Sequence, residues 1–351
     1  MRHTKLVVCS LHLAACFLPA AGAELRYELR EVSEGGVSYL ILRDKAAGIE
    51  ARVAPEKGGE LCSLRVFHNN RMAETLYRAC DYSPAPGWSG RAPLLWPATG
   101  RNFARGVTPD GNAEEGSYDY QGRRLPIPLH GFARLLPWKV ESRRENPSAA
   151  AVVLSLADTP GTRRSYPFAF RVEVEYRVTR GRLEINHTIH AGQANREPMF
   201  FSIGNHITFR TPFAEGSDPL AMTFESPSSV EYLKDGANVP TGESKPRSFA
   251  APSRLGDFKA VPAISLGGYQ GNPWMRLRDP SGLAIRLEHS ADSLPAPPVI
   301  QFNVWGDAAQ GYFSPEPWVG LQNSFNLKQG LVTLAPGKQW GWRLRIEPER
   351  P

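Results

Sequence analysis

The sequence predicts an all-β protein, and three observations support this fold class. Residues 170–178 and 183–189 alternate apolar with charged or polar side chains on either side of a short Arg180-Gly181-Arg182 turn, which is the pattern of an antiparallel hairpin with one buried face. The 351 residues include 32 glycines and 31 prolines spread along the chain, as expected for many short strands joined by turns. No segment keeps a helical period for several turns. The expected architecture is a single large antiparallel β-sandwich.

The remaining strands are predicted from apolar or alternating runs bounded by turn residues. In chain order they are Tyr39–Arg43, Ile49–Ala54, Leu61–Phe67, Ala150–Leu156, Met199–Ile203, Met222–Glu225, Met275–Arg278, Leu283–Glu288, Val299–Val304 and Gly341–Ile346. Residues 82–129 and 234–262 are rich in glycine, proline and polar side chains and are expected to be long loops, which are often functional. No change in composition divides the chain, so residues 24–351 are expected to form one domain.

Residues 1–23 are predicted to be a secretory signal peptide. Arg2 and Lys5 precede an apolar run over residues 6–18, and Ala21-Gly22-Ala23 is a small-residue cleavage site. Residues 24–351 would then be exported to the periplasm or the extracellular space. An alternative is that Cys16 ends a lipobox and carries a lipid anchor.

Composition argues against several classes of protein. The net charge is only +6 and the arginines are scattered, so a nucleic-acid partner is not expected. After the signal, no apolar run is long enough to span a membrane as a helix. No spacing typical of a metal site occurs, and neither a metal nor a cofactor is expected. Cys62 and Cys80 could form a disulfide in an oxidising compartment or remain two buried thiols.

Three parts of the chain combine a titratable residue with glycine, proline or tryptophan at the edge of a predicted strand. They are residues 96–102 together with 129–132, residues 201–206, and residues 314–320. Each could hold a histidine or a carboxylate rigidly beside a pocket. The other histidines that follow the signal have no such motif and are expected to be structural: His68, His187, His190 and His289.

In this order, these segments resemble the aldose 1-epimerase (galactose mutarotase) family, and most of all its divergent bacterial branch. Six motifs along most of the chain carry the resemblance: Gly58–Leu64, Pro93–Arg101, Leu129–Arg134, Tyr166–Phe168 with Phe201–His206, Val304–Trp318, and Leu334–Leu344. The resemblance implies the galactose mutarotase-like supersandwich, with a sugar-binding cleft on one sheet.

The resemblance also implies a set of site residues and a carbohydrate substrate. Glu316 and His206 would be the catalytic base and acid that interconvert the α and β anomers of a free sugar. Substrate binding would involve Arg101, His130, Asn102, Asn205, Trp305 and Phe209, with Trp318 as a further aromatic candidate. The chain departs from the family pattern at 207–209 and at Pro315, and no residue matches the acidic group that binds a sugar hydroxyl in many members. The sugar therefore stays undefined.

Two other functions remain open at this point. A hexose-phosphate mutarotase of the same fold would need basic residues at the cleft, and Arg105, Arg123 and Arg134 are available in the sequence. A carbohydrate-binding sandwich without activity, or one that has lost it, would not need to retain both His206 and Glu316. An assay of anomer exchange separates an enzyme from a binding protein.

Overall fold

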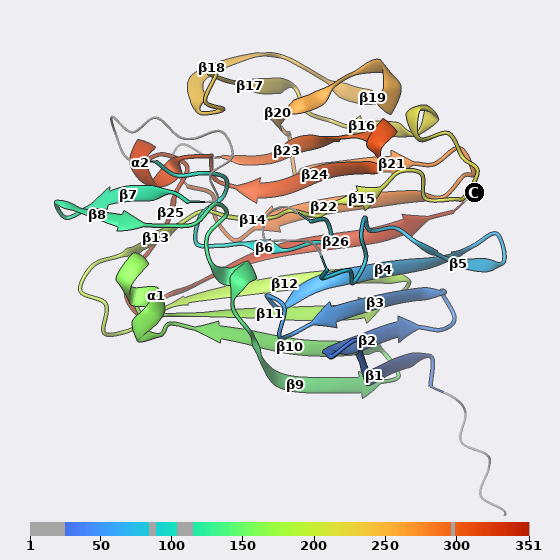
Figure 1. Cartoon of the computed structure of the whole chain (residues 1–351), viewed down its shortest axis with the longest axis horizontal. Coiled ribbons are helices and arrows are strands. Elements are labelled where there is room, and N and C mark those ends of the chain that lie inside the picture. The colour runs from blue at the N-terminus through green and yellow to red at the C-terminus, as the bar shows by residue number, and fades with distance from the viewer. Residues whose placement is uncertain (1–24, 84–88, 104–114, 296–298, 351) are drawn as a thin grey trace, which may run out of the picture.

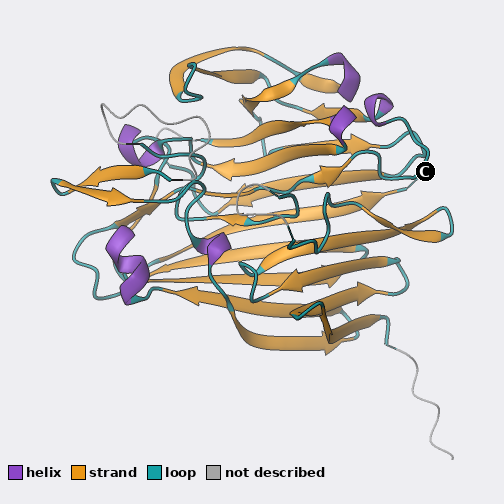
Figure 2. Cartoon of the chain, in the orientation of Figure 1, coloured by secondary structure: helices purple, strands orange, loops and turns teal. Residues whose placement is uncertain are grey.

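The computed structural model describes residues 25–83, 89–103, 115–295 and 299–350. Antiparallel strands make up most of this part of the chain, and the helices are few and short (Figures 1 and 2). The predicted all-β fold class is therefore confirmed. The predicted signal peptide and Arg105 lie outside the described residues.

One layer of the fold is a nine-stranded antiparallel sheet. Its strands lie in the order β19 (Phe249–Arg254), β16 (Thr223–Ser226), β21 (Trp274–Arg278), β22 (Ala284–Ala291), β26 (Gln339–Glu349), β12 (Arg182–Ala191), β11 (Phe170–Thr179), β10 (Ala149–Ala157) and β9 (Lys139–Asn146). The predicted hairpin is its β11–β12 pair. Buried and half-buried residues alternate along both strands, so one face of this sheet is covered by the second layer.

The second layer consists of two sheets. The eight-stranded sheet has the order β18 (Pro240–Pro246), β17 (Val230–Lys234), β20 (Ala260–Gly267), β23 (Ile300–Asp307), β24 (Tyr312–Val319), β14 (Ile203–Asn205) and β6 (Leu94–Leu95), with β15 (Phe209–Arg210) also paired to β24. The five-stranded sheet is a meander of β1 (Tyr27–Glu34), β2 (Val37–Asp44), β3 (Ile49–Ala54), β4 (Glu60–His68) and β5 (Arg71–Glu74). In Figure 1 the strands β23 and β24 lie above β1–β4.

Single bridges connect these two sheets side by side. Leu61 of β4 pairs with Ala92, and Leu76 pairs with Phe209 of β15. Between the two layers runs one continuous cluster of buried side chains, which includes Leu40 of the five-stranded sheet, Val304 of the eight-stranded sheet and Val174 of the nine-stranded sheet. The chain thus folds as a two-layer sandwich that buries one face of each sheet.

Smaller elements complete the described structure. Two-stranded sheets are formed by β13 (Met199–Phe201) with β25 (Val332–Leu334) and by β7 (Ser117–Tyr120) with β8 (Arg123–Pro126). The helical turns are η1 (Ala133–Leu135), α1 (Pro160–Ser165), η2 (Pro219–Ala221), η3 (Leu255–Asp257), η4 (Ala308–Gln310) and α2 (Ser324–Leu327). We note that no helix in the described ranges has the length and apolar character needed to cross a membrane.

The two predicted long loops are only partly loops. Residues 234–262 contain β18, β19 and the start of β20, and residues 82–129 contain β6, β7 and β8. The strands in residues 234–262 were not predicted because β18 and most of β19 are exposed at the edges of their sheets. Such strands bury neither face, so their sequence lacks the alternation from which a strand is predicted.

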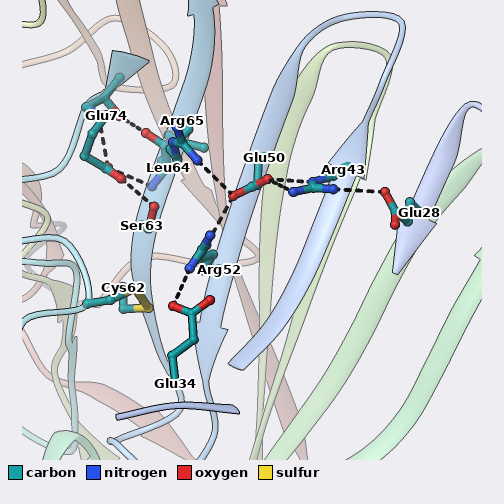
Figure 3. A network of polar contacts seen from close by, with 12 residues as sticks. Glu28, Glu34, Arg43, Glu50, Arg52, Cys62, Ser63, Leu64, Arg65 and Glu74 are labelled. Atoms are coloured by element: carbon teal, nitrogen blue, oxygen red, sulfur yellow. Dashed lines mark hydrogen bonds and ion pairs between the residues drawn. A yellow bond between two sulfur atoms is a disulfide. The ribbon is translucent and has the colours of Figure 1, made fainter. Parts of the chain in front are cut away.

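The face of the five-stranded sheet that points away from the core carries a network of charges (Figure 3). Glu50 accepts hydrogen bonds from Arg43 at 2.5 Å and from Arg52 at 3.1 Å. Burial opposes ionisation of Glu50, but the hydrogen bonds and charges of these two arginines outweigh it and lower the pKa of the carboxyl. The network therefore keeps this face polar although β2–β4 are largely buried.

A disulfide joins Cys62 of β4 to Cys80. Cys62 is fully buried against Val37, Tyr39 and Ala54, and the N–H of Cys80 donates to the carbonyl of Cys62 at 2.8 Å. Of the two states that the sequence left open, the structure shows the disulfide. It ties the segment after β5 to the outer face of the five-stranded sheet.

We expect removal of this disulfide to destabilise the protein. The bond closes a loop with a sequence separation of 18 residues, for which loss of chain entropy in the unfolded state gives about 3 kcal/mol. Urea unfolding of Cys62→Ala/Cys80→Ala should therefore show a lower midpoint than the parent chain. The parent chain unfolded in reductant is the control and should shift by a similar amount. An unchanged midpoint in both would contradict the prediction.

Candidate active site

The eight-stranded sheet carries a cavity of about 740 Å³ on its outer face. Strands β23 and β24 form its floor, and the segments that follow β6 and β14 form one side. The connection between β17 and β18 and the segment after β24 contribute the remaining walls. The cavity is lined by Gly100, Arg101, Leu129, His130, His206, Gly236, Ala237, Asn238, Ala263, Asn303, Trp305, Glu316, Trp318 and Gln322.

Strand alternation places Glu316 in the floor of this cavity. Asn303 of β23 lies opposite Glu316 of β24, and Trp305 lies opposite Ser314. Because alternate residues of a strand share a face, Asn303 and Trp305 project to the same side as Glu316 and Trp318. One carboxylate oxygen of Glu316 accepts from Asn303 Nδ2 at 3.1 Å and the other accepts from Trp318 Nε1 at 3.2 Å. The carboxyl group is thus fixed from both sides.

Burial dominates the electrostatics of Glu316. Its side chain is 2% exposed, and the loss of hydration raises the pKa of its carboxyl to about 8. The hydrogen bonds from Asn303 and Trp318 and the charge of Lys234 oppose this rise. A carboxyl group that titrates near neutral pH is suited to general acid–base catalysis.

His206 faces Glu316 from the segment that follows β14. Its N–H donates to the carbonyl of Pro93 at 3.0 Å, and its Nε2 lies 3.6 Å from Oε1 of Glu316. Nδ1 lies 3.3 Å from the hydroxyl of Thr208, which in turn lies 2.7 Å from the hydroxyl of Ser314. Burial lowers the pKa of the His206 imidazole to about 4, so the ring is neutral at pH 7. At neutral pH, His206 and Glu316 therefore share one proton, which resides mainly on the carboxyl group.

His130 is held in a single tautomer beside His206. Its Nδ1 accepts the backbone N–H of Gly100 at 3.0 Å, and therefore the ring proton is on Nε2. Burial, with the charges of His206, Arg134 and Arg101, lowers the pKa of His130 well below its usual value. The two imidazole rings meet edge to face with centroids 5.4 Å apart. His130 can thus act as a neutral hydrogen-bond donor in the cavity.

A glycine makes the approach of His130 possible. His130 and Gly131 have φ angles of +62° and +70°, and a Cβ on Gly131 would collide with the backbone carbonyl of Trp96. Gly131 also forms a parallel bridge with Trp96. Only glycine fits this combination of positive φ and close backbone contact. The motif that contains His130 is thereby anchored to the motif that contains Arg101.

Two tryptophans have different surroundings in the cavity. Trp318 is 2% exposed, and its indole occupies the space that a Cβ on Gly204 would need. Trp305 is half-buried, and its ring centroid lies 5.8 Å from that of His206 and 5.1 Å from that of Tyr312. Trp305 therefore offers an aromatic surface to a ligand, whereas Trp318 mainly holds Glu316.

Of the eight residues predicted for the site, five line the cavity: Arg101, His130, His206, Trp305 and Glu316. The other three, Phe209, Asn205 and Asn102, are buried and are not part of this lining. Phe209 pairs with Phe313 on the core face of β24. Asn205 donates its amide to the carbonyl of Ala92 at 3.0 Å, and Asn102 accepts from the N–H of Phe325 at 3.1 Å. The two asparagines thus stabilise the loops that carry His206 and Arg101.

Several residues of the cavity wall were not predicted from the sequence. Gly236, Ala237 and Asn238 come from the β17–β18 connection, and Asn303 comes from β23. Asn303 could have been predicted from the sequence, because it stands two residues before Trp305 and therefore lies on the same face of the strand. The arginines considered for phosphate binding do not line the cavity where they are described. Arg123 is exposed in β8 and Arg134 donates to the carbonyl of Leu129 at 3.1 Å.

Solved structures share this architecture. A galactose mutarotase related enzyme from Lactobacillus acidophilus matches with a TM-score of 0.68 and 20% identity, over 92% of this chain and 97% of that chain. A galactose mutarotase-like protein from Clostridium acetobutylicum matches with a TM-score of 0.71 and 18% identity, over 93% of this chain and 99% of that chain. The sandwich thus has the galactose mutarotase-like fold.

The sequence model of the family described as aldose 1-epimerase matches residues 42–258. The chain belongs to the aldose 1-epimerase family. The match includes Arg101, His130 and His206 and ends before Glu316. A curated relative from Escherichia coli (strain K12), named "Putative glucose-6-phosphate 1-epimerase", is 30% identical over 95 residues, which are 26% of this chain and 31% of that protein. This chain therefore spans about a third of the length of that relative.

Proposed function

We propose that the protein is an aldose 1-epimerase that interconverts the α and β anomers of a free sugar. The observation that carries this proposal is the pair of Glu316 and His206. Their side chains lie 3.6 Å apart at one cavity, and burial raises the pKa of the carboxyl and lowers the pKa of the imidazole. Membership of the family supports the reaction class. The identity of the substrate sugar has to be determined by an activity assay.

The reaction needs two proton transfers. A base removes the proton of the anomeric hydroxyl while an acid protonates the ring oxygen, and the bond between C1 and the ring oxygen breaks to give the open-chain aldehyde. Rotation about the C1–C2 bond presents the other face of the carbonyl, and the same two transfers in reverse close the ring. Each transfer by a positioned side chain typically contributes about 10²- to 10⁴-fold in rate.

Glu316 and His206 can exchange the proton without a net change in their charge. In ring opening, Glu316 takes the hydroxyl proton while protonated His206 gives its proton to the ring oxygen. In ring closure, protonated Glu316 returns a proton to O1 while neutral His206 takes one from O5. The two forms carry the same number of protons, so a single range of pH serves both directions.

The other cavity residues bind and orient the sugar in this proposal. The Nε2–H of His130 donates to the ring oxygen or to a neighbouring hydroxyl, and Arg101 donates to hydroxyl groups. Trp305 packs against the apolar face of the sugar ring, for which a rigid aromatic surface is well suited. Asn303 and Trp318 keep the carboxyl group of Glu316 in place.

The test is the rate of anomer exchange, followed by polarimetry of freshly dissolved α-glucose, α-galactose and other aldoses. We expect the purified protein to exceed the buffer rate on at least one of them. Glucose 6-phosphate belongs in the same panel, because the partial relative from E. coli is named for it. Activity on the phosphate alone would favour a hexose-phosphate mutarotase. Binding of sugars without any exchange would favour a carbohydrate-binding protein.

We expect a bell-shaped dependence of kcat/KM on pH, with its lower limb at about pH 4 and its upper limb at about pH 8. The active form carries one proton on the Glu316–His206 pair. Above about pH 8, the pKa of Glu316, the active form loses this proton. Below about pH 4, the pKa of His206, the active form gains a second proton. The measurement is polarimetric kcat/KM at low substrate concentration, with the buffer rate subtracted at each pH. Activity that rises through pH 8 would contradict the shared proton.

Export of residues 24–351 as one mature unit is also a proposal. The disulfide between Cys62 and Cys80 supports it, because such bonds persist mainly in oxidising compartments. A free sugar as substrate is in keeping with export, since phosphorylated sugars are mainly found inside cells.

A further inference from the structure

Lys234 lies behind the catalytic carboxyl group and is connected to it by Asn303. It is the last residue of β17, and its Nζ donates to Asn303 Oδ1 at 2.9 Å. The Nδ2 of the same Asn303 amide donates to Glu316 Oε1 at 3.1 Å. Lys234 is absent from the cavity lining, so it acts on Glu316 through Asn303 and through its charge.

An irregularity in β20 holds the ammonium group of Lys234 in place. The pairing of β20 with β23 shifts between Ala260 and Ile264, and the carbonyl of Ala263 within this shift accepts from Lys234 Nζ at 3.1 Å. A bulge of this kind frees a carbonyl that regular pairing would use. The ammonium is therefore fixed by two acceptors from neighbouring strands.

The orientation of the Asn303 amide follows from its neighbours. Its oxygen accepts from Lys234 and from the hydroxyl of Ser265 at 3.3 Å, which leaves its NH₂ group for Glu316. The reversed amide would place its NH₂ against an ammonium and its oxygen against a carboxylate, and both contacts would be repulsive. Lys234 thus determines which end of Asn303 meets Glu316.

We propose that Lys234 is a positioning residue for proton transfer, which turns the amide of Asn303 toward Glu316 and favours the ionised form of that carboxyl group. This inference rests on the proposed function of the site. It adds a residue that never touches the sugar and that acts only through Asn303 and its charge.

The charges around the pair are few enough to predict the direction of the effect. Glu316 faces His206 on one side and Lys234 on the other, and Arg134 is a further cation close to His206. Arg101 and His130 line the same cavity as the pair. Lys234 has Glu231 on its own strand as a second acidic neighbour, although Glu231 is already paired with Lys245 at 3.1 Å. Burial lowers the pKa of Lys234 to about 8 against the effect of both carboxyl groups, so Lys234 is charged through neutral pH.

Loss of the Lys234 charge should therefore raise the pKa of Glu316. An opposite charge within about 4–6 Å of a carboxyl group lowers its pKa by about one unit or more, and the charge of Lys234 acts on Glu316 in this direction. The upper limb of kcat/KM then moves to higher pH by up to about one unit, because Lys234 of the parent is itself partly neutral near pH 8. The fraction of molecules in which His206, and not Glu316, carries the shared proton falls about tenfold, because one pKa unit is a factor of ten in the proton equilibrium. Ring opening needs that form, so kcat on the plateau falls by the same factor while KM stays nearly constant.

The experiment compares four variants by two measurements. Lys234→Met removes charge and donor, Lys234→Gln removes the charge but stays polar, and Lys234→Arg keeps the charge. Lys245→Met is the matched control, because it removes an exposed lysine of the adjacent strand β18. One measurement is the titration of the Glu316 carboxyl by ¹³C NMR of glutamate-labelled protein, assigned by the signal lost in Glu316→Gln. The other is kcat and KM across pH.

We expect the pKa of Glu316 to rise in Lys234→Met and Lys234→Gln and to stay near the parent value in Lys234→Arg and Lys245→Met. In Lys234→Met and Lys234→Gln, the upper limb of kcat/KM should also move to higher pH and the plateau value of kcat should fall. An unchanged Glu316 titration in Lys234→Gln, or an equal shift in Lys245→Met, would overturn the proposal even if Lys234→Met failed to fold. The NMR titration needs no substrate. A parent protein without activity on any sugar would therefore refute the proposed function and leave this electrostatic test intact.

Discussion

Glu316→Gln is expected to lower kcat for anomer exchange by about 10²- to 10⁴-fold with little loss of stability. The size of the effect is that of one lost proton transfer. Glutamine has the shape of the acid and can accept from Asn303 or from Trp318, the two groups that now hold the carboxyl group. It has no titratable proton, so it cannot take the proton of the anomeric hydroxyl or return it.

A matched control for this variant is Glu74→Gln. Glu74 is a half-buried glutamate of β5 whose carboxyl pKa is raised by loss of hydration, but it lies in the five-stranded sheet and not in the cavity of the candidate site. Polarimetry should give Glu74→Gln a kcat close to the parent value, and thermal unfolding should show that both variants fold. Full activity in Glu316→Gln would show that Glu316 is not a catalytic residue.

The features that were predictable from sequence are those set by neighbours along the chain. The β11–β12 hairpin could be predicted because its alternation is local and its turn, Arg180-Gly181, has positive φ at both residues. His206 and His130 could be located because each stands within a short motif. The disulfide could not be decided, since spacing alone does not show that Cys62 and Cys80 meet.

The side-chain contacts that could not be predicted depend on pairing between distant strands. Asn303 meets Glu316 through the register of β23 with β24, and Lys234 meets Asn303 across β20, whose pairing with β23 shifts at this place. The position of Phe209 outside the cavity lining has a related cause. Phe209 lies opposite Phe313, and Phe313 is an odd number of residues from Glu316 and therefore points to the other face of β24. Closeness to His206 in sequence does not show on which face a side chain lies.

His206→Ala is the second change from which we expect a large effect, a fall in kcat of about 10²- to 10⁴-fold. Alanine removes the imidazole that faces Glu316 at 3.6 Å and leaves a space beside the cavity. The remaining carboxyl group can still exchange a proton with the anomeric hydroxyl, but nothing protonates the ring oxygen. Binding through Arg101, His130 and Trp305 does not need this proton, so KM should change much less than kcat.

Added imidazole gives this variant a sharper test than loss of activity alone. A small imidazole can occupy the space vacated by the side chain and supply the missing acid, so activity of His206→Ala should increase with imidazole concentration after subtraction of the imidazole-catalysed rate without protein. Glu316→Gln is the control and should not recover, because its missing group is a carboxylate. Recovery in His206→Ala alone identifies proton transfer as the role of His206. A large rise in KM with an unchanged kcat would instead assign His206 to sugar binding, and the pair would then no longer support an epimerase over a binding protein.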